Sequence, residues 1–114
     1  MKFKKVSNGQ YVSTDMEYGI QKTFDGEWSV FKNDGRVDNK LYYCVTCKYL
    51  KNAKRYVATE MLVEKISSAS VYDIEDFLGY QISADVLEGL EDRIRKILNV
   101  ITEAEFLYWE RRFL

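Results

Sequence analysis

The chain has 114 residues, 46% of them apolar, 15% aromatic and 31% charged, with a net charge of −1 and neither proline nor histidine. This composition excludes a disordered chain, and no apolar run approaches the roughly 20 residues of a membrane span. A single globular domain, residues 1–114, is the expected organisation. The basic start MKFKKVSNGQ is followed by no apolar run, so we expect no signal peptide, and two cysteines then favour reduced thiols and a cytoplasmic location.

Charge is distributed unevenly along the chain. Residues 1–65 carry twelve basic and eight acidic side chains, a net charge of +4, whereas residues 66–114 carry five and ten, a net charge of −5. Such an asymmetry is consistent with two surfaces for two different partners. Acid-rich solvated helices would give the same pattern, so both interpretations stay open.

Short apolar runs separated by glycine turns predict an antiparallel β-meander in the first half of the chain. Asn8-Gly9 and Asp25-Gly26 each lie between two such runs, and we expect type I′ turns there, with positive φ at both central residues. A longer connection is expected to start at 33–35. The candidate strands are 2–6, 10–13, 18–24, 27–32 and 40–49.

Near Leu50 the apolar period changes from two to three or four, which predicts an amphipathic helix packed on one face of the sheet. Ser70 is a typical N-cap for a second helix over 71–78, and Gly79 is a typical residue after its end. The sheet layer is therefore expected to cover about 1–49 and the helical part about 50–114.

A long third helix is predicted to begin at Ser83, and the spacing Thr102-x-x-Glu105 predicts a capping box for a last helix over 103–113. The expected fold class is α+β: a meander of three to five strands packed by a helix and followed by two or three C-terminal helices. The apolar stripe of the long helix consists of Leu87, Leu90, Ile94, Ile97, Leu98 and Ile101.

Cys44 and Cys47 have the spacing of half a zinc or redox site, but the residues around them indicate a strand. Side chains alternate between the two faces of a strand, so an odd separation sends the sulfur atoms to opposite faces. A structural zinc ion needs four ligands, and the chain has no histidine and no third cysteine. We expect plain sheet residues, and zinc shared across a dimer stays as the alternative.

Catalytic chemistry has few candidates in this sequence. The absence of histidine removes the usual general base, and no glycine-rich phosphate-binding motif is present. Carboxylate pairs such as Glu60 and Glu64 could hold a magnesium ion, although solvated helix faces carry similar pairs. We therefore expect no enzyme, no cofactor and no bound metal.

Basic residues cluster where the last strand meets the first helix, namely Lys48, Lys51, Lys54 and Arg55, and tyrosines are interleaved with them. Lysines that can contact phosphates, together with aromatic rings beside them, are typical of nucleic-acid binding. The order of strands, glycine turn and helix over residues 18–60 resembles the sheet-plus-helix arm-binding domain of phage integrases, in which the sheet reads the DNA major groove. This resemblance implies an alternative function, a nucleic-acid-binding accessory factor.

Acidic residues accumulate in the helical half. A rigid array of carboxylates can occupy a basic groove on a protein that normally holds nucleic acid. In size and composition the chain resembles small accessory proteins of phages and mobile elements, including anti-CRISPR inhibitors, and this resemblance implies a non-enzymatic inhibitor or adaptor that binds a protein. The candidate partner-binding carboxylates are Asp73, Glu75, Asp76, Asp85, Glu88, Glu91 and Asp92.

The C-terminal stretch FLYWERRFL places Phe106, Trp109 and Phe113 on one face of the last helix. Aromatic residues and arginine dominate the energetics of many interfaces, so this face is a candidate homodimer or partner surface. The same face would serve equally well to complete the core of the domain.

Overall fold

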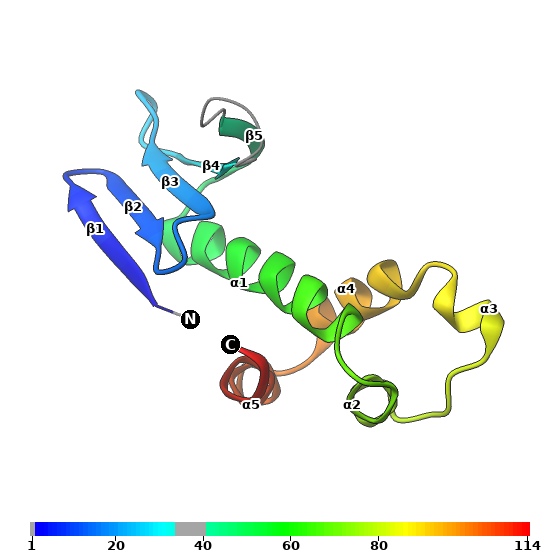
Figure 1. The fold of residues 1–114 in the computed structure, drawn as a ribbon. Helices are drawn as coiled ribbons and strands as arrows, with labels where there is room; N and C mark the ends of the chain where they lie inside the picture. The colour runs from blue at the N-terminus through cyan, green and yellow to red at the C-terminus, as the bar shows by residue number, and fades with distance from the viewer. Residues whose placement is uncertain (1, 34–40) are drawn as a thin grey trace. The chain divides into compact units, whose positions relative to one another are not determined.

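The computed structural model describes residues 2–33 and 41–114 (Figure 1). Most of the connection expected to start at 33–35 lies outside these residues. The described chain forms two compact units, Met1–Val57 (the strand unit) and Ala58–Leu114 (the helical unit), and the boundary falls inside a helix. Each unit is described by itself, and the single domain over 1–114 stays a prediction.

The strand unit contains one five-stranded antiparallel sheet whose strands follow one another in sequence order, which confirms the predicted meander (Figure 1). The strands are β1 (Phe3–Ser7), β2 (Gln10–Ser13), β3 (Tyr18–Lys22), β4 (Trp28–Asn33) and β5 (Leu41–Cys47). β3 ends two residues earlier than expected, and Phe24 is fully exposed in the turn that follows. The outer strands β1 and β5 each contain a register shift, at Lys5/Ser7 and opposite Val30/Phe31.

Both predicted hairpin turns are present, but their geometry differs from the expectation. Gly9 has a φ of 76° and Gly26 a φ of 82°, whereas Met16 is the one non-glycine residue with positive φ in the described part of the chain. A type I′ turn needs positive φ at both central residues, so the prediction of type I′ turns was wrong. In the second turn Thr23 closes the loop instead, because its hydroxyl accepts the N–H of Glu27 at 3.1 Å.

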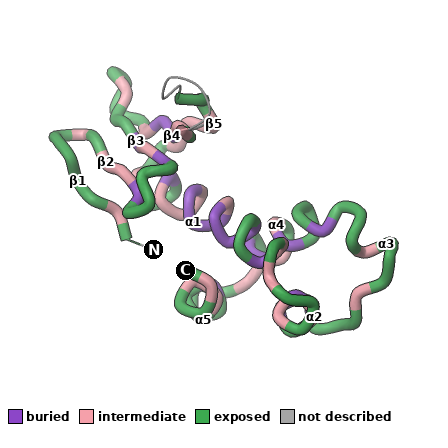
Figure 2. The backbone as a smooth tube through the Cα atoms, in the orientation of Figure 1, coloured by how far each residue is buried: buried purple, intermediate pink, exposed green. Residues whose placement is uncertain are grey.

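One face of the sheet is buried and the first turns of α1 (Leu50–Ser67) lie against it. Ile20 pairs with Val30 across β3 and β4, and both side chains are at most 2% exposed. In α1, Ala53 is also buried, and the ammonium of Lys54 lies 4.8 Å from the ring centroid of Tyr11 in β2. The predicted change from strand to helix near Leu50 is therefore confirmed, and Figure 2 shows the buried residues along α1.

β5 contains a bulge at Cys44. Val45 lies opposite Val30, but the next pair along the ladder is Phe31 with Tyr43, so Cys44 is the extra residue. Alternation is broken there, and the hydroxyl groups of Tyr43 and Thr46, three residues apart, are 2.8 Å from one another. The prediction that the two sulfur atoms lie on opposite faces assumed strict alternation of side chains along the strand, and the bulge breaks that alternation. The assignment of both cysteines to a strand is confirmed.

The helical unit begins inside α1 and continues through α2 (Val71–Leu78), α3 (Ala84–Leu87), α4 (Leu90–Val100) and α5 (Glu103–Phe113). Two predicted caps are confirmed, since Ser70 accepts the N–H of Asp73 at 3.3 Å and Thr102 accepts the N–H of Glu105 at 3.2 Å. Among the described residues, no helix has the length and apolarity needed to cross a membrane. Side chains less than 2% exposed form the core of the unit: Leu62, Ile66, Ile94, Leu98 and Phe106.

The expected long helix from Ser83 is two helices in the structure. Glu88 is extended, with ψ at 117°, and Gly89 has a φ of 78°, so α3 ends and α4 begins in a new direction. The left-handed conformation costs glycine little and other residues more, which makes Gly89 the local cause of the break. As a result Leu87 leaves the predicted apolar stripe and is 57% exposed, while Leu90 is buried.

We predict that Gly89→Ala lowers the free energy of unfolding by about 1 kcal/mol, because alanine disfavours the left-handed conformation. Nothing lies within 4 Å of the added methyl group, so no clash contributes. Urea unfolding measures the change. Gly89→Asn is the matched control and should cost less, since asparagine tolerates this conformation. If Gly89→Ala stabilises the protein, α3 and α4 form one continuous helix in solution.

The two tryptophans allow the single-domain prediction to be tested, because Trp28 is in the strand unit and Trp109 in the helical unit. We expect Trp28→Phe and Trp109→Phe each to unfold with coincident transitions in fluorescence and circular dichroism, as one cooperative domain does. A fluorescence midpoint that departs from the circular dichroism midpoint in either variant would show instead that the units unfold separately.

Candidate functional site

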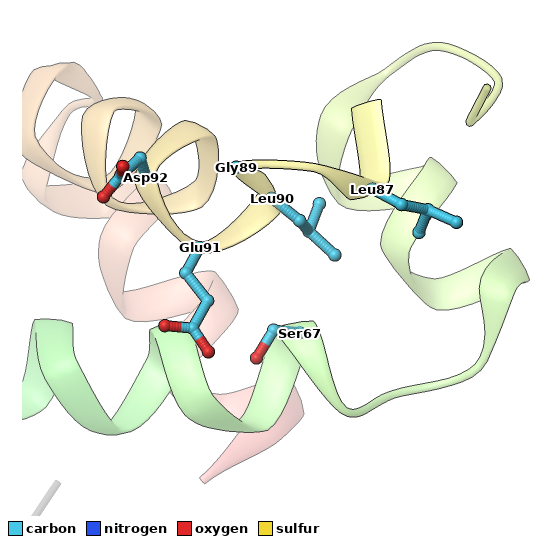
Figure 3. A pocket seen from close by; sticks show the side chains of 6 residues that line it. All are labelled: Ser67, Leu87, Gly89, Leu90, Glu91 and Asp92. Carbon is cyan, nitrogen blue, oxygen red and sulfur yellow. The ribbon is translucent and has the colours of Figure 1, made fainter. Parts of the chain in front are cut away.

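A hollow of about 560 Å³ lies at the junction of α3 and α4, next to the end of α1 (Figure 3). The break at Gly89 creates it, because the chain turns there and leaves Leu87 pointing outward from α3. Figure 3 shows Glu91 and Ser67 facing one another across it. The residues that line it are Ser67, Leu87, Gly89, Leu90, Glu91 and Asp92.

Four of the seven predicted carboxylates surround this hollow or flank it in sequence, and all four are exposed. Within residues 2–33 and 41–114, Asp85, Glu88 and Glu91 make no ion pair. Asp92 accepts a hydrogen bond from Arg95 at 2.9 Å, yet its side chain is still 77% exposed. We call the set Asp85, Leu87, Glu88, Glu91 and Asp92 the acidic patch.

A side-chain ion pair between α1 and α4 anchors α4, the helix that carries Glu91 and Asp92 of the acidic patch. Arg95 donates from Nη2 to Glu60 Oε2 at 2.9 Å and from Nε to both carboxylate oxygens at 3.3 Å. The hydrogen bonds that Arg95 donates to Glu60 raise the pKa of Arg95. Such multidentate contacts are more directional than a lysine contact and hold the two helices in one orientation.

The other three predicted carboxylates are engaged inside the helical unit. Arg112 donates to Asp73 at 2.8 Å and to Asp76, and it joins α5 to α2. The carboxylate of Glu75 accepts the backbone N–H of Ile82 at 3.1 Å. Of the expected array of seven carboxylates, four thus lie at or beside the hollow and three make contacts within the helical unit.

The pKa of Asp73 lies below its usual value because Ser70 and then Arg112 donate hydrogen bonds to the carboxylate. The pKa of Arg112 is raised, chiefly by its hydrogen bond to Asp76. The ionised form is the one that makes these contacts, so they contribute to stability only while Asp73 is ionised.

The C-terminal aromatic residues pack within the helical unit. Phe106 is 1% exposed, so its expected place at an interface was wrong: its surface is already covered. Trp109 stacks edge-on against Phe77 of α2 at 4.9 Å and lies 6.0 Å from Phe113. Trp109 and Phe113 are half-buried, and a homodimer through this face stays a prediction.

The four predicted basic residues lie together at the strand–helix join of the strand unit. Lys48 and Lys51 are exposed on either side of Tyr49, while Lys54 and Arg55 are half-buried. These four residues lie where the sequence predicts. The aromatic rings over which Lys54 lies are those of Phe3 and Tyr11, and no local sequence pattern indicates this proximity.

Neither cysteine forms a disulfide, and burial raises the pKa of the Cys47 thiol, which disfavours the reactive thiolate. Within the described ranges, no group of three or more potential metal-ligating side chains is close enough to hold an ion.

Sequence reasoning missed two features of this site: the exposure of Leu87 and the ion pair between Glu60 and Arg95. The exposure of Leu87 could have been inferred from Gly89, which interrupts an otherwise regular apolar stripe. Glycine within a helical pattern often marks the end of the helix. The second joins residues 35 positions apart, and no local signal indicates it.

In comparisons with protein-family models, curated proteins and solved structures, nothing matches the chain. A function must therefore be argued from the side chains and charges of the molecule itself.

We predict that Arg112→Gln destabilises the protein at pH 7 and that its deficit relative to wild type shrinks as the pH falls below about 4, the ordinary pKa of an aspartate. The folded-state pKa of Asp73 is lowered, so its contribution is present above the unfolded pKa and is lost as the pH falls through the folded value. Urea unfolding at pH 7, 5 and 3 measures this.

Arg111→Gln is the matched control, because Arg111 is exposed and makes no ion pair in the described part of the chain. It should leave stability unchanged at each pH. An Arg112→Gln deficit that is the same at pH 7 and pH 3 would contradict the assigned role of the ion pairs.

Proposed function

We propose that the protein is a non-enzymatic binding module, an inhibitor or adaptor of phage or mobile-element type, whose helical unit docks on a basic surface of a protein that handles nucleic acid. The observation that carries this proposal is the acidic patch, which combines the exposed side chain of Leu87 with four exposed carboxylates at the junction of α3 and α4. An apolar anchor inside a charged rim is the usual anatomy of a protein-binding surface.

The charge of the helical unit supports a basic partner. Residues 58–114 carry six basic and twelve acidic side chains, a net charge of −6. Of the basic residues, Arg95 and Arg112 are already bound to carboxylates. The exposed carboxylates would therefore steer a positively charged surface toward the patch and disfavour nucleic acid itself.

The contact would gain most of its affinity from Leu87. Burying a leucine side chain stabilises a complex by about 1.5–3 kcal/mol, whereas exposed carboxylates at a rim mainly raise the rate of association and set its salt dependence. The ion pair from Arg95 to Glu60 keeps α4 in place before binding, so little order has to be gained when the partner docks.

We predict that Leu87→Ala weakens capture of the protein partner about tenfold and that Asp85→Lys/Glu88→Lys/Glu91→Lys abolishes it. Tagged protein is incubated with nuclease-treated extract of the source cells, and bound proteins are identified and quantified for each variant. The matched control reverses three exposed carboxylates of the strand unit, Glu17→Lys/Asp25→Lys/Glu27→Lys, and changes the net charge equally.

The proposal requires a partner whose capture survives nuclease and the control substitutions but is lost with the patch substitutions. A set of captured proteins that is the same for wild type and both patch variants would rule out the acidic patch as the docking surface.

A further inference from the structure

The strand unit carries a row of lysines and aromatic rings that four strands and a helix bring together. The ammonium of Lys22 lies 5.9 Å from the ring of Trp28, and the rings of Trp28 and Tyr11 are 5.9 Å apart. Lys54 of α1 lies 4.8 Å from the ring of Tyr11 and 5.7 Å from that of Phe3. We call these five residues the lysine–aromatic row.

Sheet register explains how residues distant in sequence form this row. Lys22 is paired directly with Trp28, and Tyr11 is paired with Ile20, two residues before Lys22, so these side chains share the face of the sheet on which α1 lies. Ile20 is buried there, whereas Tyr11 and Trp28 are half-buried and Lys22 is exposed. Lys5 is paired with Tyr11 and adds a further exposed lysine to the same face.

A second group of the same composition lies where β5 leads into α1. The side chain of Tyr49 is 53% exposed, with the ammonium of Lys48 at 5.6 Å and that of Lys51 at 6.0 Å from its ring. Lys51 is three residues before Lys54, so one turn of α1 links this group to the lysine–aromatic row.

Within the described residues, no carboxylate pairs with the lysines of these two groups. Within residues 2–33 and 41–114 none of them forms an ion pair, in contrast to Arg95 and Arg112 of the helical unit. Residues 1–57 carry eleven basic and six acidic side chains, a net charge of +5. The lysines concerned are Lys5, Lys22, Lys48, Lys51 and Lys54.

We infer that the strand unit binds single-stranded nucleic acid along this surface, a role separate from the docking proposed for the helical unit. Unpaired lysines supply charge for successive phosphates, and release of counterions from the strand drives binding. The exposed ring of Tyr49 offers a stacking surface to a base, and stacking needs a base that is not held in a duplex. Contacts to aromatic rings keep the ammonium groups in place before binding.

The test uses a fluorescently labelled 20-nucleotide single strand of mixed sequence and the full chain, with fluorescence anisotropy at several salt concentrations. We expect Lys22→Gln/Lys54→Gln to weaken binding at least tenfold at low salt and to reduce the slope of log affinity against log salt by about 1.4, about 0.7 for each lost phosphate contact. Tyr49→Ala should weaken binding about tenfold without changing the slope.

Lys65→Gln/Lys96→Gln removes two exposed lysines of the helical unit and is the matched control, which should leave affinity unchanged. Trp109→Phe leaves Trp28 as the one tryptophan, and quenching of its fluorescence by the single strand reports binding at the row itself. Leu87→Ala leaves the net charge unchanged and should bind the strand like wild type, so failure here and failure of the proposed docking are distinguishable.

Three results would overturn the inference. The first is affinity for the single strand that is undetectable at low salt or unchanged in Lys22→Gln/Lys54→Gln. The second is that a duplex or heparin binds as tightly as the single strand, because neither of them offers an unpaired base to Tyr49. The third is a change of oligomeric state in Tyr49→Ala by light scattering, which would assign this surface to self-association.

Discussion

The ion pair between Glu60 and Arg95 is the contact that holds α4, and with it two of the four carboxylates of the candidate docking surface, against α1. α4 begins after an extended Glu88 and a left-handed Gly89, so it gains no support from a continuation of α3. The guanidinium of Arg95 supplies that support by binding both oxygens of Glu60 in α1. Burial of Ile94 on the same helix completes it, and Glu91 and Asp92 then stand on a fixed element.

Arginine and lysine are used differently in the two units. Arg95 and Arg112 each bind two carboxylates and join helices, a role suited to a planar group with several donors in fixed directions. Lys22 and Lys54 of the strand unit instead lie over aromatic rings and have no ion pair in the described residues. Two arginines are therefore engaged in the fold of the helical unit, whereas Lys22 and Lys54 of the strand unit keep their charge unpaired within the described residues.

Local patterns predicted most of the secondary structure because their causes are local. The change of period near Leu50, the caps at Ser70 and Thr102 and the glycine turns at Gly9 and Gly26 each depend on residues within a few positions of one another. The prediction of type I′ turns failed because the turn type depends on backbone angles, and the same residues can adopt the angles of more than one turn type.

Features that depend on distant residues could not be predicted. The bulge at Cys44 follows from the register of β5 on β4, and that register reflects packing across the whole sheet. The division of the acidic residues into exposed and engaged sets was hidden for the same reason, since the partner of Asp73 and Asp76 is a residue of α5. Charge counts along the sequence cannot separate carboxylates that stabilise the fold from those that face solvent.

The register shifts in β1 and β5 affect how the molecule behaves at high concentration. The outer strands of an open sheet expose unpaired backbone groups, and a second copy can add its own strand there and start a fibril. β5 would be a good template, since Leu41, Tyr42 and Tyr43 are all exposed. The extra residue in each outer strand bends and twists that strand, so a straight incoming strand cannot form a continuous ladder of hydrogen bonds. The two bulges thus protect the sheet against aggregation.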